Sequence, residues 1–260
     1  MTDLHTILDK FANGSLNLSE AEKQISIHAI EKIDDIAQLD VGREIRRGGM
    51  PEIVFAENKE YRDIIRIALA IVRRNHLAVV SRIRKNELAK VVYALRRKGL
   101  NIETGRNCTT VLASEKSFAC KLTDAKIGIM SAGTSDIGIA EEARIAAKAM
   151  GCEAITGYDV GIAGMHRLLL SLKDMMKQDI DAIVVVAGME GALASVVASI
   201  VDVPVVGVPT SIGYGFGANG LAALASMLQS CTLGLSVVNI DNGIGAGAYA
   251  ALIAKRTKKN

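Results

Sequence analysis

The second half of the chain alternates short apolar runs with longer, helix-like runs. Runs such as DAIVVVAG and PVVGVPTS are rich in Val and end in small or polar residues, as buried strands do. Helix-like runs such as SDIGIAEEARIAAKAMG separate them. Strands separated by helices of this length form a parallel sheet covered on both faces. The sequence therefore predicts an α/β fold over residues 126–260, with a doubly wound parallel sheet of the three-layer, flavodoxin-like type.

The first half has a different pattern. PEIVFA and AVVSRI resemble short strands, and YRDIIRIALAIVRRN and NELAKVVYALRRKG resemble amphipathic helices. We therefore predict a small N-terminal α+β domain over residues 1–125 and a second domain over residues 126–260. A basic cluster of Arg43, Arg46 and Arg47 follows the first helices, and we favour a solvated turn over a phosphate site for it.

Composition and charge exclude several classes of protein. The net charge of +3 is too small to indicate nucleic-acid binding. The longest apolar stretch, from Gly191 to Val208, is interrupted by Asp202 and Pro204, so no membrane span is predicted. The N-terminal residues do not resemble a secretory signal. No two of the four cysteines are spaced as CxxC or lie near a His, so we expect no metal site and a cytoplasmic protein with reduced thiols.

No Lys or Arg occurs between Gln178 and Ala254. Surface helices in water normally carry some basic residues. This stretch therefore indicates extensive burial, and we expect part of it to lie against other copies of the chain.

Doubly wound sheets bind ligands beyond the carboxyl ends of their strands. The first such loop, SAGTSD, joins a strand to a helix, so its backbone N–H groups can bind an anion. Ser131, Thr134, Ser135 and Asp136 add hydroxyl groups and a carboxylate. Helix capping by Ser135 or Asp136 is the alternative role, and it is compatible with ligand binding.

Two further loops carry ionisable groups. His166 and Arg167 begin a helix after a Gly-containing loop, and Arg167 suits a phosphate or carboxylate. For His166 a structural and a catalytic role are about equally supported. Glu190 follows an apolar strand, between Gly188 and Gly191, where a solvated carboxylate is unexpected. We expect a raised pKa and a role in proton transfer for Glu190.

Gly-rich segments follow. Gly215 lies in VPTSIGYGFGANG, which is flexible enough to close over a ligand. Gly245 lies in NGIGAGAYA, whose GxGxG pattern is too weak to indicate a dinucleotide-binding site of the Rossmann type.

Cys231 lies in SMLQSCTLGL, between a helix-like run and a strand-like run. It could be a small core residue or a nucleophile. Because it follows a helix, the helix dipole opposes a thiolate there. For Cys108, Cys120 and Cys152 we favour a structural role. The sequence TTVLASEKSFA between Cys108 and Cys120 is expected to be a connecting segment.

The loops of the second half, in this order, resemble the aminoimidazole ribonucleotide carboxylase family known as PurE. SAGTSD is similar to that family's GSxSD loop, and His166-Arg167 to its AHR motif. The run VVVAGMEGALASVVASIVDVPVVGVP is similar to its apolar strand, Gly loop, helix and VPVLGVP strand.

The resemblance to the LarB family is closer and covers nearly the whole chain. It is carried by GREIRRGGMPEIVFAENK, VVVAGMEGALASVVA, GYGFGANG and SCTLGLSVVNIDNGIGAGAYA. LarB proteins make a precursor of the nickel-pincer nucleotide cofactor. The resemblance implies that the nicotinate ring of nicotinic acid adenine dinucleotide is carboxylated at C5 with CO2 or bicarbonate. It also implies hydrolysis of the phosphoanhydride, which gives pyridinium-3,5-biscarboxylic acid mononucleotide and AMP.

The resemblance also implies that Cys231 adds covalently to the pyridinium ring. The implied catalytic residues are Cys231, Glu190, His166 and Asp136. The implied substrate-binding residues are Ser131, Thr134, Ser135, Arg167, Gly188, Gly191, Gly215 and Gly245. No tightly bound cofactor is expected, although the substrate's phosphates can bring Mg²⁺ with them. The PurE-like domain implies a homo-octamer.

Two alternatives stay open at this point. One is an aminoimidazole ribonucleotide carboxylase or mutase of purine synthesis, whose electron-rich substrate needs no thiol. The other is a non-catalytic nucleotide-binding protein, which predicts binding without turnover and without an adduct on Cys231.

Overall fold

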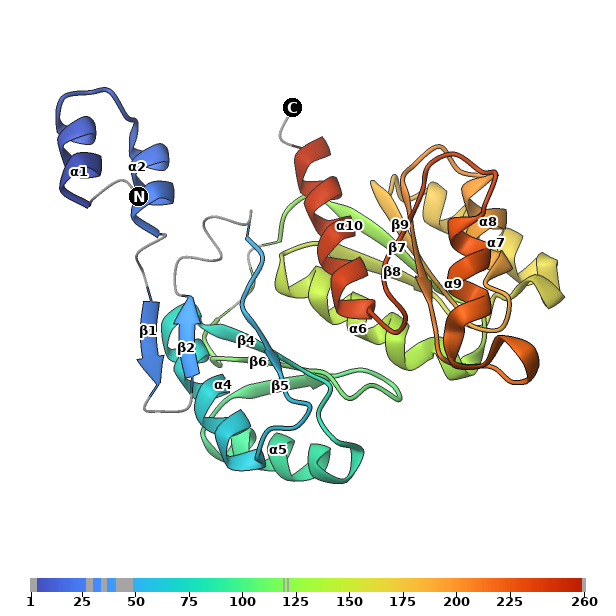
Figure 1. Cartoon of the computed structure of the whole chain (residues 1–260), viewed down its shortest axis with the longest axis horizontal. Coiled ribbons are helices and arrows are strands. Elements are labelled where there is room, and N and C mark those ends of the chain that lie inside the picture. Colours follow the sequence, from blue (N-terminus) through green and yellow to red (C-terminus); the bar gives the residue numbers. More distant parts are fainter. Residues whose placement is uncertain are drawn as a thin grey trace. The chain divides into compact units, whose positions relative to one another are not determined.

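The chain divides into two compact units (Figure 1). The computed structural model describes residues 4–26, 30–33, 37–40, 49–118, 120 and 122–258. Unit 1 comprises Met1–Ile102 and Leu112–Phe118, and unit 2 comprises Glu103–Val111 and Ala119–Asn260. Unit 2 therefore includes a short segment from the first half of the chain.

Unit 2 contains a five-stranded sheet in the order β11-β10-β9-β7-β8, and its described pairings are parallel. The strands are β7 (Lys126–Ser131), β8 (Glu153–Gly157), β9 (Ala182–Ala187), β10 (Val205–Pro209) and β11 (Leu235–Val237). Gly128 of β7 pairs with Ile155 of β8 and with Ile183 of β9. This strand order is that of flavodoxin-like, doubly wound sheets, so the predicted fold is confirmed.

Helices cover both faces of this sheet (Figure 1). They are α6 (Ile137–Ala149), α7 (Met165–Met176), α8 (Ala192–Ala198), α9 (Leu221–Leu228) and α10 (Gly243–Thr257). Helices α6 and α10 pack together on one face, and α7, α8 and α9 share a core with β9 on the other. All six residues of β9 are buried, which explains its continuous apolar sequence.

Glycines allow α10 to approach α6 closely. A methyl group added at Gly247 would lie 2.2 Å from the carbonyl oxygen of Ala143, and one at Gly243 would lie 2.2 Å from that of Ile139. Backbone atoms therefore occupy the space that side chains would need. The Gly/Ala-rich sequence of α10 is explained by this contact.

Gly247→Ala is expected to lower the free energy of unfolding by about 2 kcal/mol, because the two helices must separate. Urea unfolding measures this loss. Gly234→Ala is the control: nothing lies within 4 Å of its added methyl group, so only the cost of its positive φ, about 1 kcal/mol, is expected. Equal losses at the two positions would contradict a close helix contact.

A four-stranded sheet in the order β3-β4-β6-β5 lies mostly in unit 1. Its strands are β3 (Ile53–Phe55), β4 (Leu77–Ser81), β5 (Asn101–Thr104) and β6 (Val111–Ser114). The helices of unit 1 include α4 (Tyr61–Asn75) and α5 (Lys85–Arg97). Four elements precede them in the chain: the helices α1 (Leu4–Ala12) and α2 (Leu18–Ile25), and the antiparallel strand pair β1 (Ile30–Ile33) and β2 (Ala37–Asp40). Ile64, Ile67 and Ile71 of α4 are buried, as the helical pattern predicts.

The presence of strand β6 shows that one prediction was wrong. The stretch TTVLASEKSFA, predicted to be a connecting segment, contains β6, one of the two interior strands of the four-stranded sheet. Only three consecutive apolar residues mark it, too few for a periodic signal. The predicted basic cluster of Arg43, Arg46 and Arg47 lies outside the described residues. Among the described residues, no helix is both long and apolar enough to cross a membrane.

Candidate functional site

The candidate site lies where the strand order of unit 2 reverses, between β7 and β9. Ligands of doubly wound sheets bind at the carboxyl ends of the strands at this position. A pocket of about 310 Å³ opens there. The side chains and backbone that line it include Ser135, Asp136, Ile162, Gly188, Met189 and Glu190. The pocket therefore combines an apolar wall with two carboxylates.

Asp136 is the buried carboxylate of the pocket, with only 4% of its surface exposed. It accepts hydrogen bonds from the Gly133 N–H at 2.9 Å and from the Thr210 hydroxyl at 2.7 Å. Burial raises the pKa of Asp136 above its ordinary value, although these two bonds act in the opposite direction. Asp136 is therefore held in one orientation and is suited to carry a proton.

A close approach of two loops shapes the pocket beside Asp136. A side chain at Gly188 would lie 2.2 Å from the carbonyl oxygen of Ile212 and 2.7 Å from the hydroxyl oxygen of Thr210. Gly188 is therefore required for packing, and its backbone forms part of the pocket wall. Thr210 was not among the predicted site residues; its position at the end of the PVVGVPTS strand was the available signal.

Ser131 and Arg167 are joined through Asp159, another residue that the sequence analysis missed. Ser131 is buried, and its hydroxyl accepts a hydrogen bond from the Asp159 N–H at 3.3 Å. The Asp159 carboxylate forms an ion pair with Arg167 Nη1. About half of the Arg167 side chain is exposed, so its guanidinium can still bind an anion. Ser131 thus positions the loop rather than lining the pocket.

The remaining polar candidates lie at the rim or outside the pocket. Glu190 lines the pocket, but its side chain is exposed. The prediction that this carboxylate is shielded from solvent is therefore wrong for a single chain. Thr134 and Ser135 are exposed, and of the two only Ser135 is among the described lining residues. His166 is exposed in the first turn of α7, next to Arg167.

Cys231 is exposed, but it lies at the opposite end of the strands from the pocket. Gly234, three residues later, accepts a hydrogen bond from the N–H of Val205 at the amino end of β10. Hydroxyl groups hold the segment against α8: Ser195 Oγ lies 2.9 Å from Ser230 Oγ. The pocket, by contrast, lies at the carboxyl ends of the strands, and the described residues that line it do not include Cys231.

The other cysteines differ from Cys231. Cys108 and Cys152 are buried, and burial raises the pKa of both thiols, that of Cys108 to about 11. Cys120 is partly buried, and its thiol lies 3.3 Å from the carbonyl oxygen of Lys148. A buried thiol with a raised pKa is a poor nucleophile.

The predicted glycines have identifiable backbone roles. Gly191 has a φ of 68° and abuts α9, because a side chain there would lie 2.9 Å from the Ala223 carbonyl oxygen. The Gly245 N–H donates to Asn242 Oδ1, which caps α10. Gly215 has a φ of 76° and nothing within 4 Å of an added methyl group. The described lining of the pocket includes none of these three glycines.

The pocket therefore brings together four of the predicted residues, namely Ser135, Asp136, Gly188 and Glu190. Arg167 and His166 follow its wall in sequence, and Ser131 supports that wall. Among the residues that the structure describes, no three His, Cys, Asp or Glu side chains are grouped closely enough to hold a metal ion.

Two family models match the chain. The AIR carboxylase model matches residues 126–260, and the LarB/PurE-like N-terminal domain model matches residues 30–111. An uncharacterized protein of Methanocaldococcus jannaschii is 45% identical over 254 residues, which cover 97% of this chain and 97% of that protein.

Two mutases match the second half. The N5-carboxyaminoimidazole ribonucleotide mutase of Methanocaldococcus jannaschii is 33% identical over 129 residues, covering 49% of this chain and 75% of the mutase. The N5-carboxyaminoimidazole ribonucleotide mutase of Thermotoga maritima is 29% identical over 133 residues, which cover 49% of this chain and 74% of that mutase. These matches support a carboxylase-like or mutase-like function. The chain belongs to the LarB family, and its C-terminal domain is PurE-like.

Proposed function

We propose that this protein carboxylates the nicotinate ring of nicotinic acid adenine dinucleotide at C5 and hydrolyses the phosphoanhydride. The products are pyridinium-3,5-biscarboxylic acid mononucleotide and AMP. One observation carries the proposal: an exposed thiol, Cys231, in a chain with a PurE-like pocket. An electron-rich aminoimidazole needs no thiol, whereas an electron-poor pyridinium needs a nucleophile before its C5 can react.

The thiol makes the ring reactive by a reversible addition. The Cys231 thiolate forms a bond to C4 of the pyridinium, and the electron pair moves to give a neutral dihydropyridine. C5 is then an enamine carbon, and it forms a new C–C bond to CO2, which enters as such or is formed from bicarbonate. A base removes the C5 proton, the C4–S bond breaks, and the thiolate leaves as aromaticity returns.

The pocket residues take the remaining roles in this proposal. Asp136 or Glu190 receives the C5 proton, with His166 as a third proton carrier beside the loop. Ser135 and the backbone of Gly188 contact the ring and its ribose, and Arg167 binds a phosphate. Mg²⁺ would be held by the phosphates of the substrate, and it would supply charge neutralisation for the attack of water on the anhydride.

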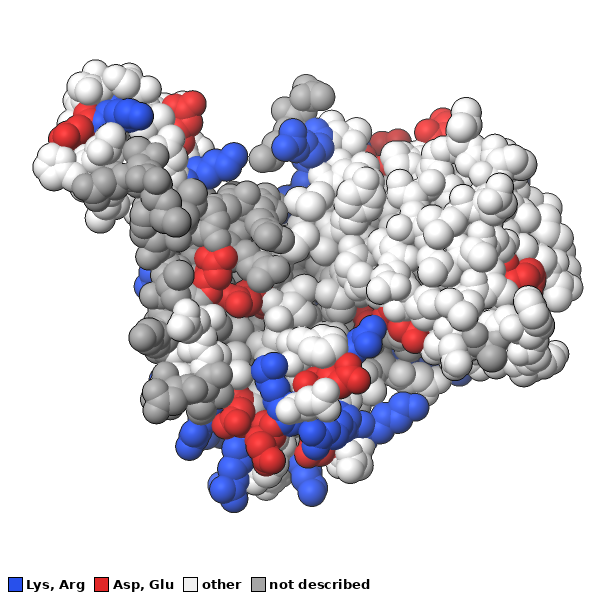
Figure 2. Space-filling model, in the orientation of Figure 1, with Lys and Arg blue, Asp and Glu red and all other residues white. Residues whose placement is uncertain are grey.

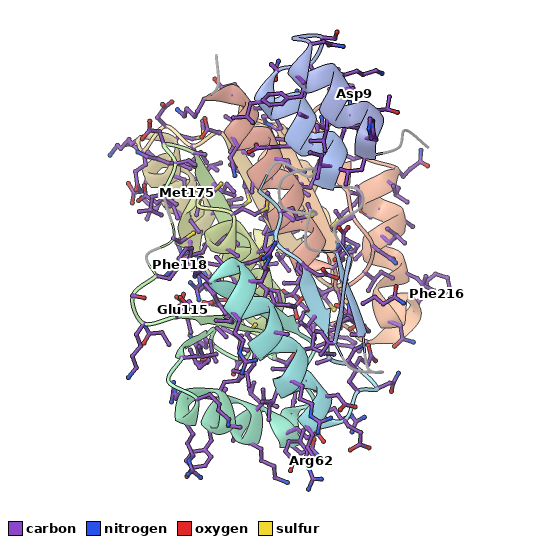
Figure 3. All side chains as sticks on the ribbon, turned by 90° about the vertical axis from the view of Figure 1, so that its left-hand side faces the viewer. Asp9, Arg62, Glu115, Phe118, Met175 and Phe216 are labelled. Carbon is purple, nitrogen blue, oxygen red and sulfur yellow. The ribbon has the colours of Figure 1, made fainter. Side chains whose placement is uncertain are left out.

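We propose that a second copy of the chain supplies the thiol, because Cys231 lies near the amino ends of the strands, whereas the pocket of its own chain lies at their carboxyl ends. Exposed apolar side chains flank both places. Tyr214 and Phe216 follow the pocket residue Ile212 in the sequence, and Leu228 and Leu233 flank Cys231. Phe216 projects fully into solvent (Figure 3), and in the view of Figure 2 unit 2 carries mostly uncharged side chains. Such surfaces favour self-association, and we propose the homo-octamer.

Subunit complementation tests the shared site. Cys231→Ser and Asp136→Asn chains, each of low activity alone, are mixed, dissociated in mild denaturant and reassembled. Activity should reappear in the mixed oligomers, because some sites combine an intact thiol with an intact carboxylate. Light scattering measures the size of the assembly. Mixed oligomers without regained activity would contradict a site built from two chains.

Intact-protein mass spectrometry tests the chemistry. After incubation with nicotinic acid adenine dinucleotide or its NAD analogue, a mass increase equal to the ligand is expected, and peptide mapping should place it on Cys231. Turnover without an adduct would contradict covalent catalysis. Binding without turnover or adduct would indicate a non-catalytic nucleotide-binding protein.

The similarity to two mutases favours a second candidate, a carboxylase or mutase acting on aminoimidazole ribonucleotides. Parallel assays with N5-carboxyaminoimidazole ribonucleotide and with nicotinic acid adenine dinucleotide distinguish the candidates. We expect turnover only of the dinucleotide. The reverse result would select the mutase.

A further inference from the structure

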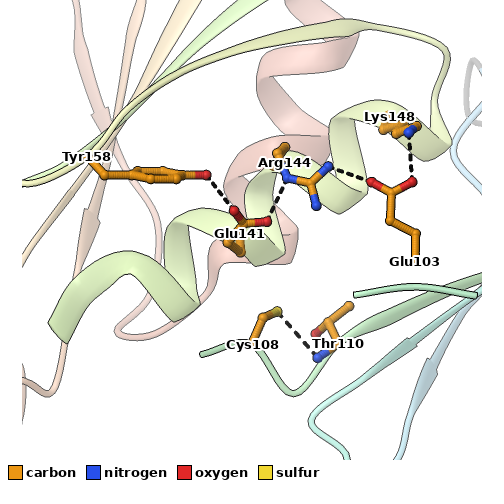
Figure 4. A network of polar contacts seen from close by, with 7 residues as sticks. All are labelled: Glu103, Cys108, Thr110, Glu141, Arg144, Lys148 and Tyr158. Carbon is orange, nitrogen blue, oxygen red and sulfur yellow. Dashed lines mark hydrogen bonds and ion pairs between the residues drawn. The ribbon is translucent and has the colours of Figure 1, made fainter. Parts of the chain in front are cut away.

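A network of charged and polar contacts crosses α6 in unit 2 (Figure 4). The Tyr158 hydroxyl donates to Glu141 Oε1 at 2.8 Å, and Arg144 Nε donates to Glu141 Oε2 at 2.6 Å. Arg144 Nη1 and Lys148 Nζ then donate to the two carboxylate oxygens of Glu103, each at 2.6 Å. The network thus runs from the loop after β8 to the segment Glu103–Val111.

Two central members of this network are largely removed from water. The side chains of Glu141 and Arg144 are only 9% and 19% exposed. Burial opposes ionisation of Glu103, but bonds from Lys148 and Arg144 outweigh it and lower the pKa of that carboxyl. Burial and the Glu141 carboxylate raise the pKa of Tyr158, so the phenol keeps its proton and acts as a donor. Buried charges of this kind are costly unless every partner is held in place.

The segment Glu103–Val111 is fitted to α6 at several points. A side chain at Gly105 would lie 2.4 Å from Glu141 Oε2, and one at Gly138 would lie 2.5 Å from the Asn107 carbonyl oxygen. The Thr110 hydroxyl donates to Glu142 Oε1 at 3.1 Å. This segment is matched by the N-terminal family model, yet by its contacts it belongs to unit 2.

At its other end the network reaches the pocket. Tyr158 directly precedes Asp159, which pairs with Arg167 and donates its N–H to Ser131. The next two N–H groups, of Val160 and Gly161, donate to carbonyl oxygens at the end of β7, at 3.0 and 2.8 Å. Asp159 has a φ of 58°, a left-handed conformation that a residue other than Gly keeps only when its surroundings hold it.

We propose that Tyr158 is a positioning residue of the site and that Glu103, through Arg144 and Glu141, completes its support. Tyr158 fixes the turn at residues 158–161, and Asp159 in that turn orients the Arg167 guanidinium toward the anionic part of the ligand. The segment Glu103–Val111 therefore supports the wall of the pocket. The role given to Arg167 rests on the proposed function, whereas the fixing of the turn does not.

Hydrogen exchange tests the fixing of the turn without any substrate. In Tyr158→Phe the amides of residues 159–161 should exchange about tenfold faster than in the wild type, because a hydrogen bond to a charged group is lost. Amides of β9 should be unchanged. Tyr93→Phe is the matched control: Tyr93 is exposed on α5, and phenylalanine keeps its ring contact with Arg97. Unchanged exchange at residues 159–161 in Tyr158→Phe would overturn the proposal.

Steady-state kinetics tests the consequence for the ligand. Tyr158→Phe should raise KM for nicotinic acid adenine dinucleotide about tenfold with little change in kcat, because Arg167 binds the same anion in the ground state and the transition state. Glu103→Gln should raise KM about threefold. The double variant should resemble Tyr158→Phe alone, because both changes act through one network.

Two kinetic results would contradict the positioning role: multiplied effects in the double variant, or a lower kcat at unchanged KM. If the wild type does not turn over the dinucleotide, the proposed function fails. The exchange measurement then decides the positioning role by itself, so the two failures are distinguishable.

Discussion

Cys231→Ser should lower the rate of carboxylation by at least about 10³-fold while leaving the fold intact. The loss is large because serine cannot add to a pyridinium ring and leave again as a thiolate does. The fold should survive because Cys231 is exposed, and the segment is held to α8 through its neighbours, Ser230 to Ser195 at 2.9 Å and Thr232 to the Ser195 carbonyl at 3.4 Å. Product formation measured by chromatography, with circular dichroism in parallel, checks both statements.

Cys120→Ser serves as the matched control, because Cys120 is a cysteine of unit 2 that forms no disulfide in the structure and takes no part in the proposed chemistry. It should keep both the activity and the adduct of the wild type. The rate of anhydride hydrolysis by Cys231→Ser offers a second comparison. It should fall less than the rate of carboxylation, because the thiol addition activates the ring and not the phosphates. Cys231→Ser with full carboxylation activity would contradict the proposed mechanism.

The alternating pattern of the second half was sufficient to predict its fold. Continuous Val-rich runs marked strands buried on both faces, and β9 is buried along its whole length. The doubly wound topology then places the pocket, because the strand order reverses between β7 and β9. Asp136 and Gly188 lie in the loops that follow these strands, so both could be predicted from the sequence.

The contacts that complete the site could not be predicted from one sequence. Thr210 donates to Asp136 across 74 positions of sequence, and Glu103 pairs with Arg144 across 41. No local periodicity records such pairs. Similarly, a sequence shows that Cys231 precedes a strand, but only the parallel pairing of β10 with β11 shows that it lies at the end of the sheet opposite the pocket.

Asp136→Asn should lower kcat/KM by about 10²-fold, the loss expected when a group that carries a proton is removed. Asparagine has nearly the same shape, and its oxygen can accept the Gly133 N–H while its amide donates to the Thr210 hydroxyl. The hydrogen bonds of the pocket are therefore preserved in number. Ser135→Ala is the control at the rim, where the hydroxyl is exposed and a smaller loss is expected.

The stability of the same variant should depend less on pH than the stability of the wild type does. Because burial raises the pKa of Asp136, the folded chain binds this proton more tightly than the unfolded chain does. The stabilisation is complete below the ordinary aspartate pKa of about 4 and is lost as the pH rises through the raised value. Asp136→Asn has no proton to lose, so its free energy of unfolding should fall less than that of the wild type between about pH 4 and pH 7. Urea titrations across this range measure the difference, and parallel curves would show that Asp136 does not titrate differently in the folded protein.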